Sequence, residues 1–379
     1  MSRIRVIHAP EAVAGQSAEL AAAERRAGLD SEAISLRPHP FGYGGIRVFG
    51  KSTLKPPEVF AAWFRMFFHV LRHCDVLHLN FGRSIFDPGP NMLSRIPRWS
   101  GLRLFFFLLQ RLEFLCYRVR GIVVFVTYQG DDVRQGDRQS NGEGPSMSSR
   151  VETGYYTKES DAIKRCRIRF FARQARRIYY LNPDLARVTE GKAEFLPYAS
   201  VNLREWGAVA PDASEPCHLV HAPSHRGAKG TEFVLEAVQR LRDEGIPFRF
   251  SLVEGKTRQE ARAIYESAHL VVDQLLAGWY GGLAVECMAL GRPVIARIRE
   301  EDLDAIPPEM RRELPLVRAT PDTLGEVLRE WLRKPAEALR ERGDASRKFV
   351  EKWHDPDAIA IRMKKDYEEA LEGCRSWRH

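Results

Sequence analysis

Two cations stand three positions apart in a glycine-containing loop in the second half of the chain. The stretch "HRGAKG", residues 225–230, places Arg226 and Lys229 just before a helix expected to begin near Thr231. Because the first amides of a helix also attract anions, this arrangement suits a diphosphate. The other interpretation is a solvated basic loop capped by Thr231, and the loop alone does not decide between them.

A second stretch, "GWYGGLAVECMALGRPVIA" at residues 278–296, holds a single acidic residue, Glu286. Its neighbours on an expected helix over 283–290 are apolar, so the segment should be buried, and a buried carboxylate needs a partner. One interpretation is an ion pair or a favourable position in the helix dipole. The other is a ligand diol, such as a ribose, that donates to Glu286, beside helix amides that face an anion or a sugar hydroxyl.

The elements that position these residues alternate between strand and helix, which indicates parallel sheets. The expected fold class is α/β, with two Rossmann-like doubly wound parallel-sheet domains that face each other across a cleft. Pro197, Pro211 and Pro216 mark a linker, so we expect domains over 1–205 and 206–355 and a C-terminal helix, 356–379, that packs on the first domain. The strands expected from apolar runs are "RIRVIHA", "SEAISL", "DVLHLN", "GIVVFVTYQG", "ARRIYYLN", "HLVHAP", "FRFSLVEG", "LVVDQL" and "RPVIARI".

Composition and charge restrict the class of protein. Of the 379 residues 44% are hydrophobic and 28% charged, which is ordinary for a globular protein. The six cysteines form no Cys-x-x-Cys pair, and no leader precedes "RIRVIHAP", so we expect a cytoplasmic protein with reduced thiols. Residues 1–200 carry 30 Lys and Arg against 19 Asp and Glu, whereas the remainder carries 28 against 31, so the first half should meet any anionic partner.

The two stretches that hold Arg226, Lys229 and Glu286 resemble the donor domain of family 4 glycosyltransferases of the GT-B fold. The N-terminal half is similar through "HAPEAVAGQSAELAAAERRAGLDSEAISL", "DVLHLNFGRS" and "VVFVTYQGDDVR". The resemblance implies retaining transfer of a sugar from a nucleotide-sugar donor, with no cofactor beyond that substrate and no metal. The acceptor, whether a glycan, a lipid-linked molecule or a small molecule, is not identified by it.

The resemblance also assigns roles by position. Arg226 and Lys229 would hold the diphosphate and act in catalysis, and Glu286 would bind the ribose. The donor-binding set is completed by Gly15, Gln16, Tyr280, Gly281, Gly282, Leu283, Glu254 and Asp273. Arg83 and Asp131 are the acceptor-side candidates.

Two positions depart from the family. Gly278 stands where the family has the first of two glutamates, and Gln129, a catalytic candidate, stands where it often has a histidine. Both differences concern the sugar rather than the nucleotide, so nucleotide-diphosphate binding is the firmer expectation. A protein that binds a nucleotide sugar without transferring it is the alternative.

A basic stretch in the first half concerns other classes of interaction. The stretch "KRCRIRFFARQARR", residues 164–177, has seven basic residues and would present Arg165, Arg169, Arg173 and Arg176 on one helical face. A solvated face is one interpretation, and contact with an anionic acceptor or with the inner face of a membrane is the other. The aromatic-rich stretches "VFAAWFRMFFHVLRHC" and "LRLFFFLLQRLEFLCYRVRG" contain charged residues and cannot span a bilayer, so we expect helices that pack on the N-terminal sheet or, alternatively, lie in an interface. Nucleic-acid binding is not expected, because zinc-finger spacings and RNA-binding aromatic signatures are absent from the sequence.

Overall fold

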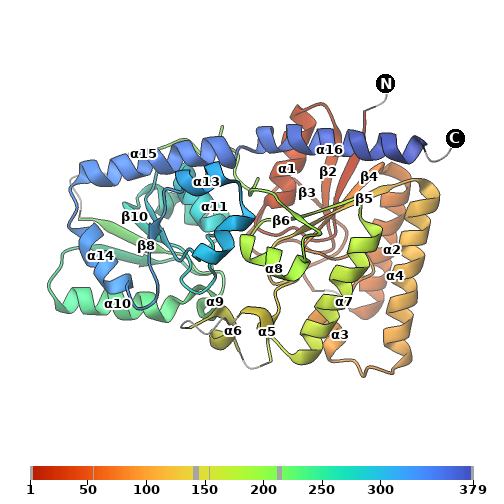
Figure 1. Ribbon diagram of the computed structural model, residues 1–379, viewed down its shortest axis with the longest axis horizontal. Coiled ribbons are helices and arrows are strands. Elements are labelled where there is room, and N and C mark those ends of the chain that lie inside the picture. Colours follow the sequence, from red (N-terminus) through yellow and green to blue (C-terminus); the bar gives the residue numbers. More distant parts are fainter. Residues whose placement is uncertain (1–2, 54, 140–144, 153, 211–215, 377–379) are drawn as a thin grey trace. The chain divides into compact units, whose positions relative to one another are not determined.

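The computed structural model describes residues 3–53, 55–139, 145–152, 154–210 and 216–376. The chain divides into two compact units (Figure 1). Unit 1 consists of residues 1–138, 156–200 and 356–379, and unit 2 consists of residues 139–155 and 201–355. This division differs from the sequence expectation in two respects. Residues 139–155 belong with the second half of the chain, and the boundary between the halves lies after residue 200 rather than after residue 205.

Unit 1 is built on a seven-stranded parallel sheet of order β3-β2-β1-β4-β5-β6-β7. Its strands β1, β4 and β5 are almost entirely buried, as apolar runs covered on both faces of a parallel sheet must be. The strands are β1 Arg5–Ala9, β2 Asp30–Ser35, β3 Ile46–Val48, β4 Val76–Asn80, β5 Val123–Tyr128, β6 Arg177–Tyr180 and β7 Glu194–Phe195.

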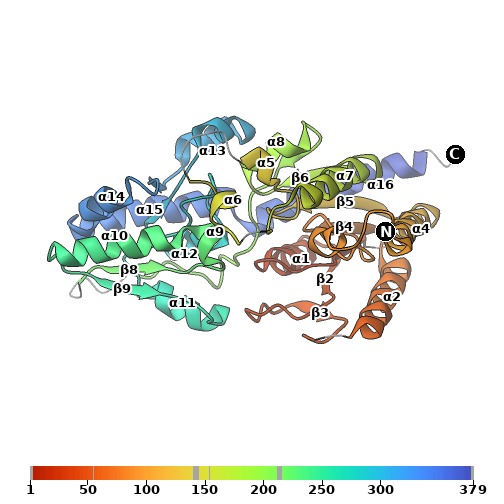
Figure 2. The same ribbon diagram turned by 90° about the horizontal axis from the view of Figure 1, so that it is seen from below.

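Helices pack around the seven-stranded sheet and complete unit 1. The last helix, α16, packs against α1, where the Tyr367 hydroxyl donates to Glu24 at 3.0 Å and lies 2.7 Å from His78 Nδ1. Helices α2 and α4 pack against each other, as Figures 1 and 2 show. The main helices are α1 Gln16–Arg26, α2 Pro56–His73, α4 Gly101–Arg120, α7 Lys158–Gln174 and α16 Pro356–Ser376, with the shorter α3 Pro90–Ser94, α5 Gly136–Gln139 and α8 Ala186–Thr189.

Unit 2 contains a five-stranded parallel sheet of order β12-β11-β10-β8-β9. Its core brings Leu219 of β8, Val272 of β10 and Ile295 of β11 together with the apolar face of α10. The strands are β8 His218–His221, β9 Arg249–Leu252, β10 Leu270–Val272, β11 Val294–Ala296 and β12 Val317–Arg318. The helices are α6 Met147–Arg150, α9 Arg226–Lys229, α10 Thr231–Asp243, α11 Arg258–Glu266, α12 Gly282–Ala289, α13 Pro308–Glu313, α14 Leu324–Leu332 and α15 Ala336–Trp353.

Each sheet has one place where the strand order reverses. In unit 1 the reversal lies between β1 and β4, and in unit 2 it lies between β8 and β10. Connections leave these neighbouring strands in opposite directions, which opens a crevice at their carboxyl ends where α/β proteins bind ligands. The two parallel-sheet α/β units confirm the fold class expected from the sequence.

The basic stretch over residues 164–177 differs from the expected continuous helix. Helix α7 ends at Gln174, and Arg176 lies in the short connection to β6. Arg176 therefore does not continue the helical face of Arg165, Arg169 and Arg173. Two other cations of this stretch are buried, since Lys164 donates to the Arg134 carbonyl oxygen at 2.7 Å and Arg167 donates to that of Gly82.

Candidate functional site

Lys229 occupies the reversal point of the unit 2 sheet. It ends α9, directly after the loop that follows β8, and its Nζ lies 2.6 Å from Gln274 Oε1 and 3.3 Å from Asp273 Oδ1. Asp273 follows β10 and is completely buried, and its Oδ2 accepts a 2.6 Å hydrogen bond from the Gly281 amide. The carboxylate therefore connects the cation to the start of α12.

The loop from Asp273 to Gly281 is held by buried contacts. Gln274 donates through Nε2 to the Trp279 carbonyl oxygen, and the Tyr280 hydroxyl lies 2.7 Å from His354 Nε2. A Cβ at Gly281 would lie 2.9 Å from Lys229 Nζ, so a side chain at this position would displace the ammonium group. The expectation that the amides of 280–283 face a ligand needs one amendment, because the Gly281 amide already serves Asp273.

Arg226, the other predicted cation, lies at the first position of α9 and forms a two-point ion pair with Glu254. Its Nε and one terminal nitrogen are each 2.8 Å from the carboxylate oxygens, and the Arg226 side chain remains half exposed. The side-chain hydrogen bond from Arg226 lowers the pKa of Glu254 and keeps that carboxylate ionised. The pair joins the loops after β8 and β9, so the predicted residues Arg226 and Glu254 do meet.

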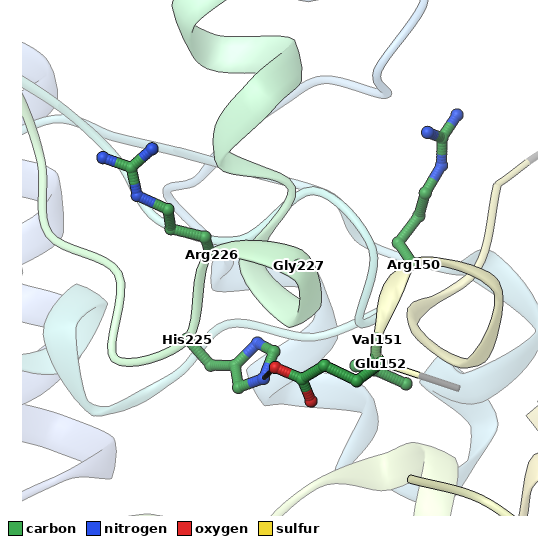
Figure 3. Close-up of a pocket in the computed structure, with 6 residues that line it drawn as sticks. All are labelled: Arg150, Val151, Glu152, His225, Arg226 and Gly227. Carbon is green, nitrogen blue, oxygen red and sulfur yellow. Dashed lines mark ion pairs between the residues drawn. The ribbon is translucent and has the colours of Figure 1, made fainter. Parts of the chain in front are cut away.

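A cavity of about 460 Å³ lies beside this pair in unit 2 (Figure 3). Figure 3 shows Arg226 and Arg150 on either side of Gly227, with His225 turned toward Glu152. His225 Nδ1 accepts from the Ala228 amide at 3.2 Å, so its Nε2, 3.3 Å from a Glu152 oxygen, carries the proton. The cavity thus adds three polar side chains that the sequence did not indicate, Arg150, Glu152 and His225.

Gly227 is required by the approach of α6 to α9. A Cβ on Gly227 would lie 2.2 Å from the Arg150 carbonyl oxygen, a separation that no side chain can adopt. Met147 of α6 packs with Leu276 and Ala277, and the Arg150 guanidinium lies 5.1 Å from the Phe233 ring centre. In the structure this glycine therefore admits another segment of the chain.

Glu286 lies in the middle of α12 and is only 9% exposed, as its apolar neighbours predicted. Its Oε1 accepts a 2.9 Å hydrogen bond from Arg258 Nε, and Arg258 begins α11 and stacks over the Trp206 ring. Of the two interpretations offered by the sequence, the ion pair is present, since Arg258 satisfies the buried carboxylate. A role for Glu286 in ligand binding must rest on its position at the carboxyl edge of the sheet.

The unit 1 candidates Gly15 and Gln16 begin α1, after β1. Gly15 adopts φ +71°, and a Cβ there would lie 2.9 Å from the Tyr43 ring, so both the backbone and the space require glycine. Gln16 is buried, and its Oε1 accepts from the Ala199 amide at 2.7 Å. The observed contact of Gln16 is thus structural.

The other unit 1 candidates follow neighbouring strands of the sheet. Arg83, after β4, pairs with Glu11, after β1, and this ion pair spans the reversal point of the sheet. Asp131 accepts a 2.5 Å hydrogen bond from the Tyr156 hydroxyl. Gln129 is largely buried, and its backbone N–H donates to the Asp132 carboxylate. Burial raises the pKa of Asp132 to about 6.

Two kinds of site are absent from the part of the chain that the structure describes. Within these residues no three His, Cys, Asp or Glu side chains gather closely enough to hold a metal ion. None of the described helices combines the length and apolar character that crossing a bilayer requires.

Comparison of the fold with solved structures finds glycosyltransferases along nearly the whole chain. A sucrose-phosphate synthase from Thermosynechococcus elongatus matches with a TM-score of 0.63 at 16% identity, over 98% of this chain and 100% of that one. HepE of Anabaena, in complex with UDP and glucose, matches with a TM-score of 0.60 at 9% identity, over 97% and 100%. The catalytic domain of Arabidopsis thaliana starch synthase IV, bound to ADP and acarbose, matches with a TM-score of 0.55 at 11% identity, over 98% and 100%.

No protein-family model matches the chain, and no curated protein sequence matches it. At these identities the structural matches concern the fold alone, which is the GT-B fold with two parallel-sheet α/β units.

Proposed function

We propose that this chain is a glycosyltransferase that moves a sugar from a nucleoside-diphosphate donor to an acceptor. One observation carries the proposal. Lys229 lies at the reversal point of the unit 2 sheet, where it forms an ion pair with Asp273 next to the start of α12. A cation beside helix amides at the carboxyl ends of parallel strands suits the phosphates of a nucleotide. Solved structures of the same fold include proteins bound to UDP and ADP.

In this proposal the donor diphosphate binds near Lys229 and Arg226. Its oxygens would take the places that the carboxylates of Asp273 and Glu254 hold toward these cations in the structure. Departure of the sugar adds negative charge to the diphosphate, and preorganised cations stabilise that charge more in the transition state than in the bound donor. Arg150 and His225, which line the adjoining cavity, would extend the binding surface.

The ribose is assigned to Glu286, with Arg258 as the residue that orients its carboxylate. Since Asp273 uses the Gly281 amide, the amides of Gly282 and Leu283 are the ones we assign to the phosphates or the sugar. Retention of configuration, independence from metal and kinship with family 4 remain parts of the proposal that rest on the sequence resemblance.

Unit 1 is assigned to the acceptor and to the transferred sugar. Arg83 follows β4, and Gln129 and Asp131 follow β5, so all three lie at the carboxyl edge of the unit 1 sheet. Gly15, whose conformation only glycine adopts readily, allows the chain to turn into α1 at the same edge. The acceptor's identity, whether glycan, lipid-linked or small molecule, is left to experiment.

One feature favours the alternative of a protein that binds the donor without transferring it. A Cβ at Gly278 would lie 2.9 Å from Arg299 Cβ and 3.3 Å from an Asp302 oxygen, so the local structure has no room for the acidic side chain of the family motif. A contact to the transferred sugar would therefore have to come from another residue.

A product assay separates these functions. The chain is incubated with UDP-, ADP- and GDP-linked sugars, with and without simple glycan acceptors, and nucleotides and sugars are separated by chromatography. Release of a nucleoside diphosphate with transfer of the sugar to water or to an acceptor supports the transferase. Donors that bind but stay intact under all conditions favour the binding protein, and donors that do not bind contradict both.

A further inference from the structure

Helix α4 of unit 1 presents an unusually apolar face to solvent. Trp99, just before the helix, is 93% exposed, and Val119 near its end is 74% exposed. The opposite side of α4 is buried through Phe106, Phe114 and Tyr117, so the helix is well packed and its outer side is uncovered. The exposed residues, which we call the α4 face, are Trp99, Leu102, Leu104, Phe105, Phe107, Leu108, Leu112, Leu115 and Val119, with Phe64 and Phe68 on the adjoining α2.

The face follows the period of a helix. Leu104, Leu108 and Leu115 lie within one narrow stripe, because positions four and eleven residues apart return to the same side of a helix. Single exposed leucines are ordinary on protein surfaces, but a contiguous apolar stripe that runs along a 20-residue helix indicates an interaction site.

The exposed charged side chains that flank the leucine stripe on α4 are arginines. Arg111 and Arg118 lie beside the leucine stripe, and Arg111 stacks over the rings of Phe107 and Phe170 at 4.7 and 5.3 Å. The acid of α4, Glu113, is fully buried and accepts hydrogen bonds from the amides of Ile85 and Phe86. Further exposed arginines are Arg95, Arg98 and Arg120 toward the two ends of α4, and Arg65 and Arg72 on α2, the helix that packs against α4.

The apolar stripe and its flanking arginines distinguish between two partners of the α4 face, a second copy of the chain and a lipid surface. A second copy bound through a two-fold axis would place the α4 face against itself, and Arg111 and Arg118 would then face arginines without an acid from α4 to pair with. A surface of anionic lipids satisfies both parts of the face. The leucines and phenylalanines would enter the boundary of the acyl chains, and the arginines and Trp99 would lie at the level of the headgroups.

We propose that unit 1 binds reversibly to anionic membrane surfaces through the α4 face, with α4 lying in the plane of the interface. The sequence offered the basic stretch of α7 and, as an alternative to packing on the sheet, an interfacial position for the aromatic-rich helices α2 and α4. Lys164 and Arg167 of α7 are buried, whereas one side of α4 is exposed. The exposed Arg169 and Arg173 of α7 remain available to contribute, since Phe170 packs against Phe114 of α4. The proposal concerns the surface alone and does not depend on the reaction catalysed.

Sedimentation with lipid vesicles tests the proposal. The full chain is mixed with vesicles of phosphatidylcholine alone, or of phosphatidylcholine with phosphatidylglycerol, and the bound fraction is measured against lipid concentration. Wild type should bind the anionic vesicles at least about tenfold more tightly than the neutral ones, and added salt should weaken this binding. The double variant Leu108→Glu/Leu115→Glu should lose at least about tenfold in affinity for the anionic vesicles.

The control is Ile361→Glu on α16, which puts the same charge on another exposed apolar residue of unit 1. It should bind vesicles like wild type, and thermal unfolding should show that both variants are folded. Equal loss in Ile361→Glu, or unchanged binding in the Leu108/Leu115 variant, would overturn the assignment. Light scattering gives the remaining decisive outcome: a dimer in the absence of lipid that Leu108→Glu/Leu115→Glu dissociates would mean that the face binds a second copy instead.

Discussion

The ammonium group of Lys229 lies 3.3 Å from a carboxylate oxygen of Asp273, and this pair joins the loops that follow the neighbouring strands β8 and β10. Asp273 is completely buried, and the Lys229 side chain is 16% exposed. A pair in such surroundings is strongly coupled, because removing either charge leaves the other without its partner in a region of low dielectric.

A double-mutant cycle should measure this coupling. We expect Asp273→Asn and Lys229→Met each to lower the free energy of unfolding, and the double variant to lose less than the sum of the two, with a coupling of roughly 1–3 kcal/mol. Denaturant unfolding of the four proteins gives the value. The exposed pair Arg329–Glu244 is the control and should show weaker coupling. Additive losses at Lys229 and Asp273 would show that the pair is not coupled.

Gly227→Ala should destabilise unit 2, because the new methyl group would lie 2.2 Å from the Arg150 carbonyl oxygen and would force α6 away from α9. We expect a loss of roughly 1–3 kcal/mol in the free energy of unfolding. Gly325→Ala, on α14 with open space around its Cβ, is the matched control and should be neutral or slightly stabilising. If the two variants are equally stable, α6 does not pack on α9 as described.

Glu286→Gln should weaken the binding of nucleosides and nucleoside diphosphates by similar factors, because the carboxylate is assigned to the ribose that both contain. The expected loss is roughly 1.5–3 kcal/mol, the cost of replacing a charged acceptor by a neutral one. Glu266→Gln, which removes the charge of the Arg262–Glu266 pair on α11, is the control and should bind like wild type. Unchanged affinity in Glu286→Gln would remove this residue from the site.

Burial raises the pKa of Glu113 to about 7 from an ordinary value of 4.5. Between these pH values the folded protein holds a proton that the unfolded chain has released, so the contribution of Glu113 to stability is present below pH 4.5 and is lost as the pH rises toward 7. Relative to Glu113→Gln, wild type should therefore lose roughly 3 kcal/mol of unfolding free energy across this window. Denaturant titrations of both proteins at several pH values give the difference, and a pH-independent difference would contradict the assignment.

Much of the fold could be predicted because strands buried on both faces of a parallel sheet are continuous apolar runs in the sequence. The apolar runs of β1, β4 and β5, and the glycine-flanked turns that follow strands, gave the two α/β units and placed Arg226, Lys229 and Glu254 at one sheet edge. The contacts among these residues were not predictable, since the Arg226–Glu254 and Lys229–Asp273 pairs join positions 28 and 44 residues apart.

What the sequence missed depends on tertiary packing. Arg258, which satisfies Glu286, begins another helix and carries no local signal of that role. The segment with α6 has no apolar periodicity long enough to show that it packs in unit 2. Its close approach to α9 is possible only because Gly227 has no side chain. Lys164 and Arg167 belong to the same basic stretch, and nothing in the local sequence indicates that they are buried and donate to the backbone carbonyl groups of Arg134 and Gly82.

Isothermal titration calorimetry with UDP, ADP and GDP, on wild type and on Lys229→Met, tests the central claim most directly. We predict that at least one of these nucleotides binds wild type at one site per chain and that Lys229→Met binds it at least about tenfold more weakly. The corresponding nucleoside should bind both proteins equally, because it has no phosphate for Lys229 to contact. Absence of binding to wild type, or equal affinity of the diphosphate for the two proteins, would contradict the assignment of a nucleoside-diphosphate site to the reversal point of the unit 2 sheet.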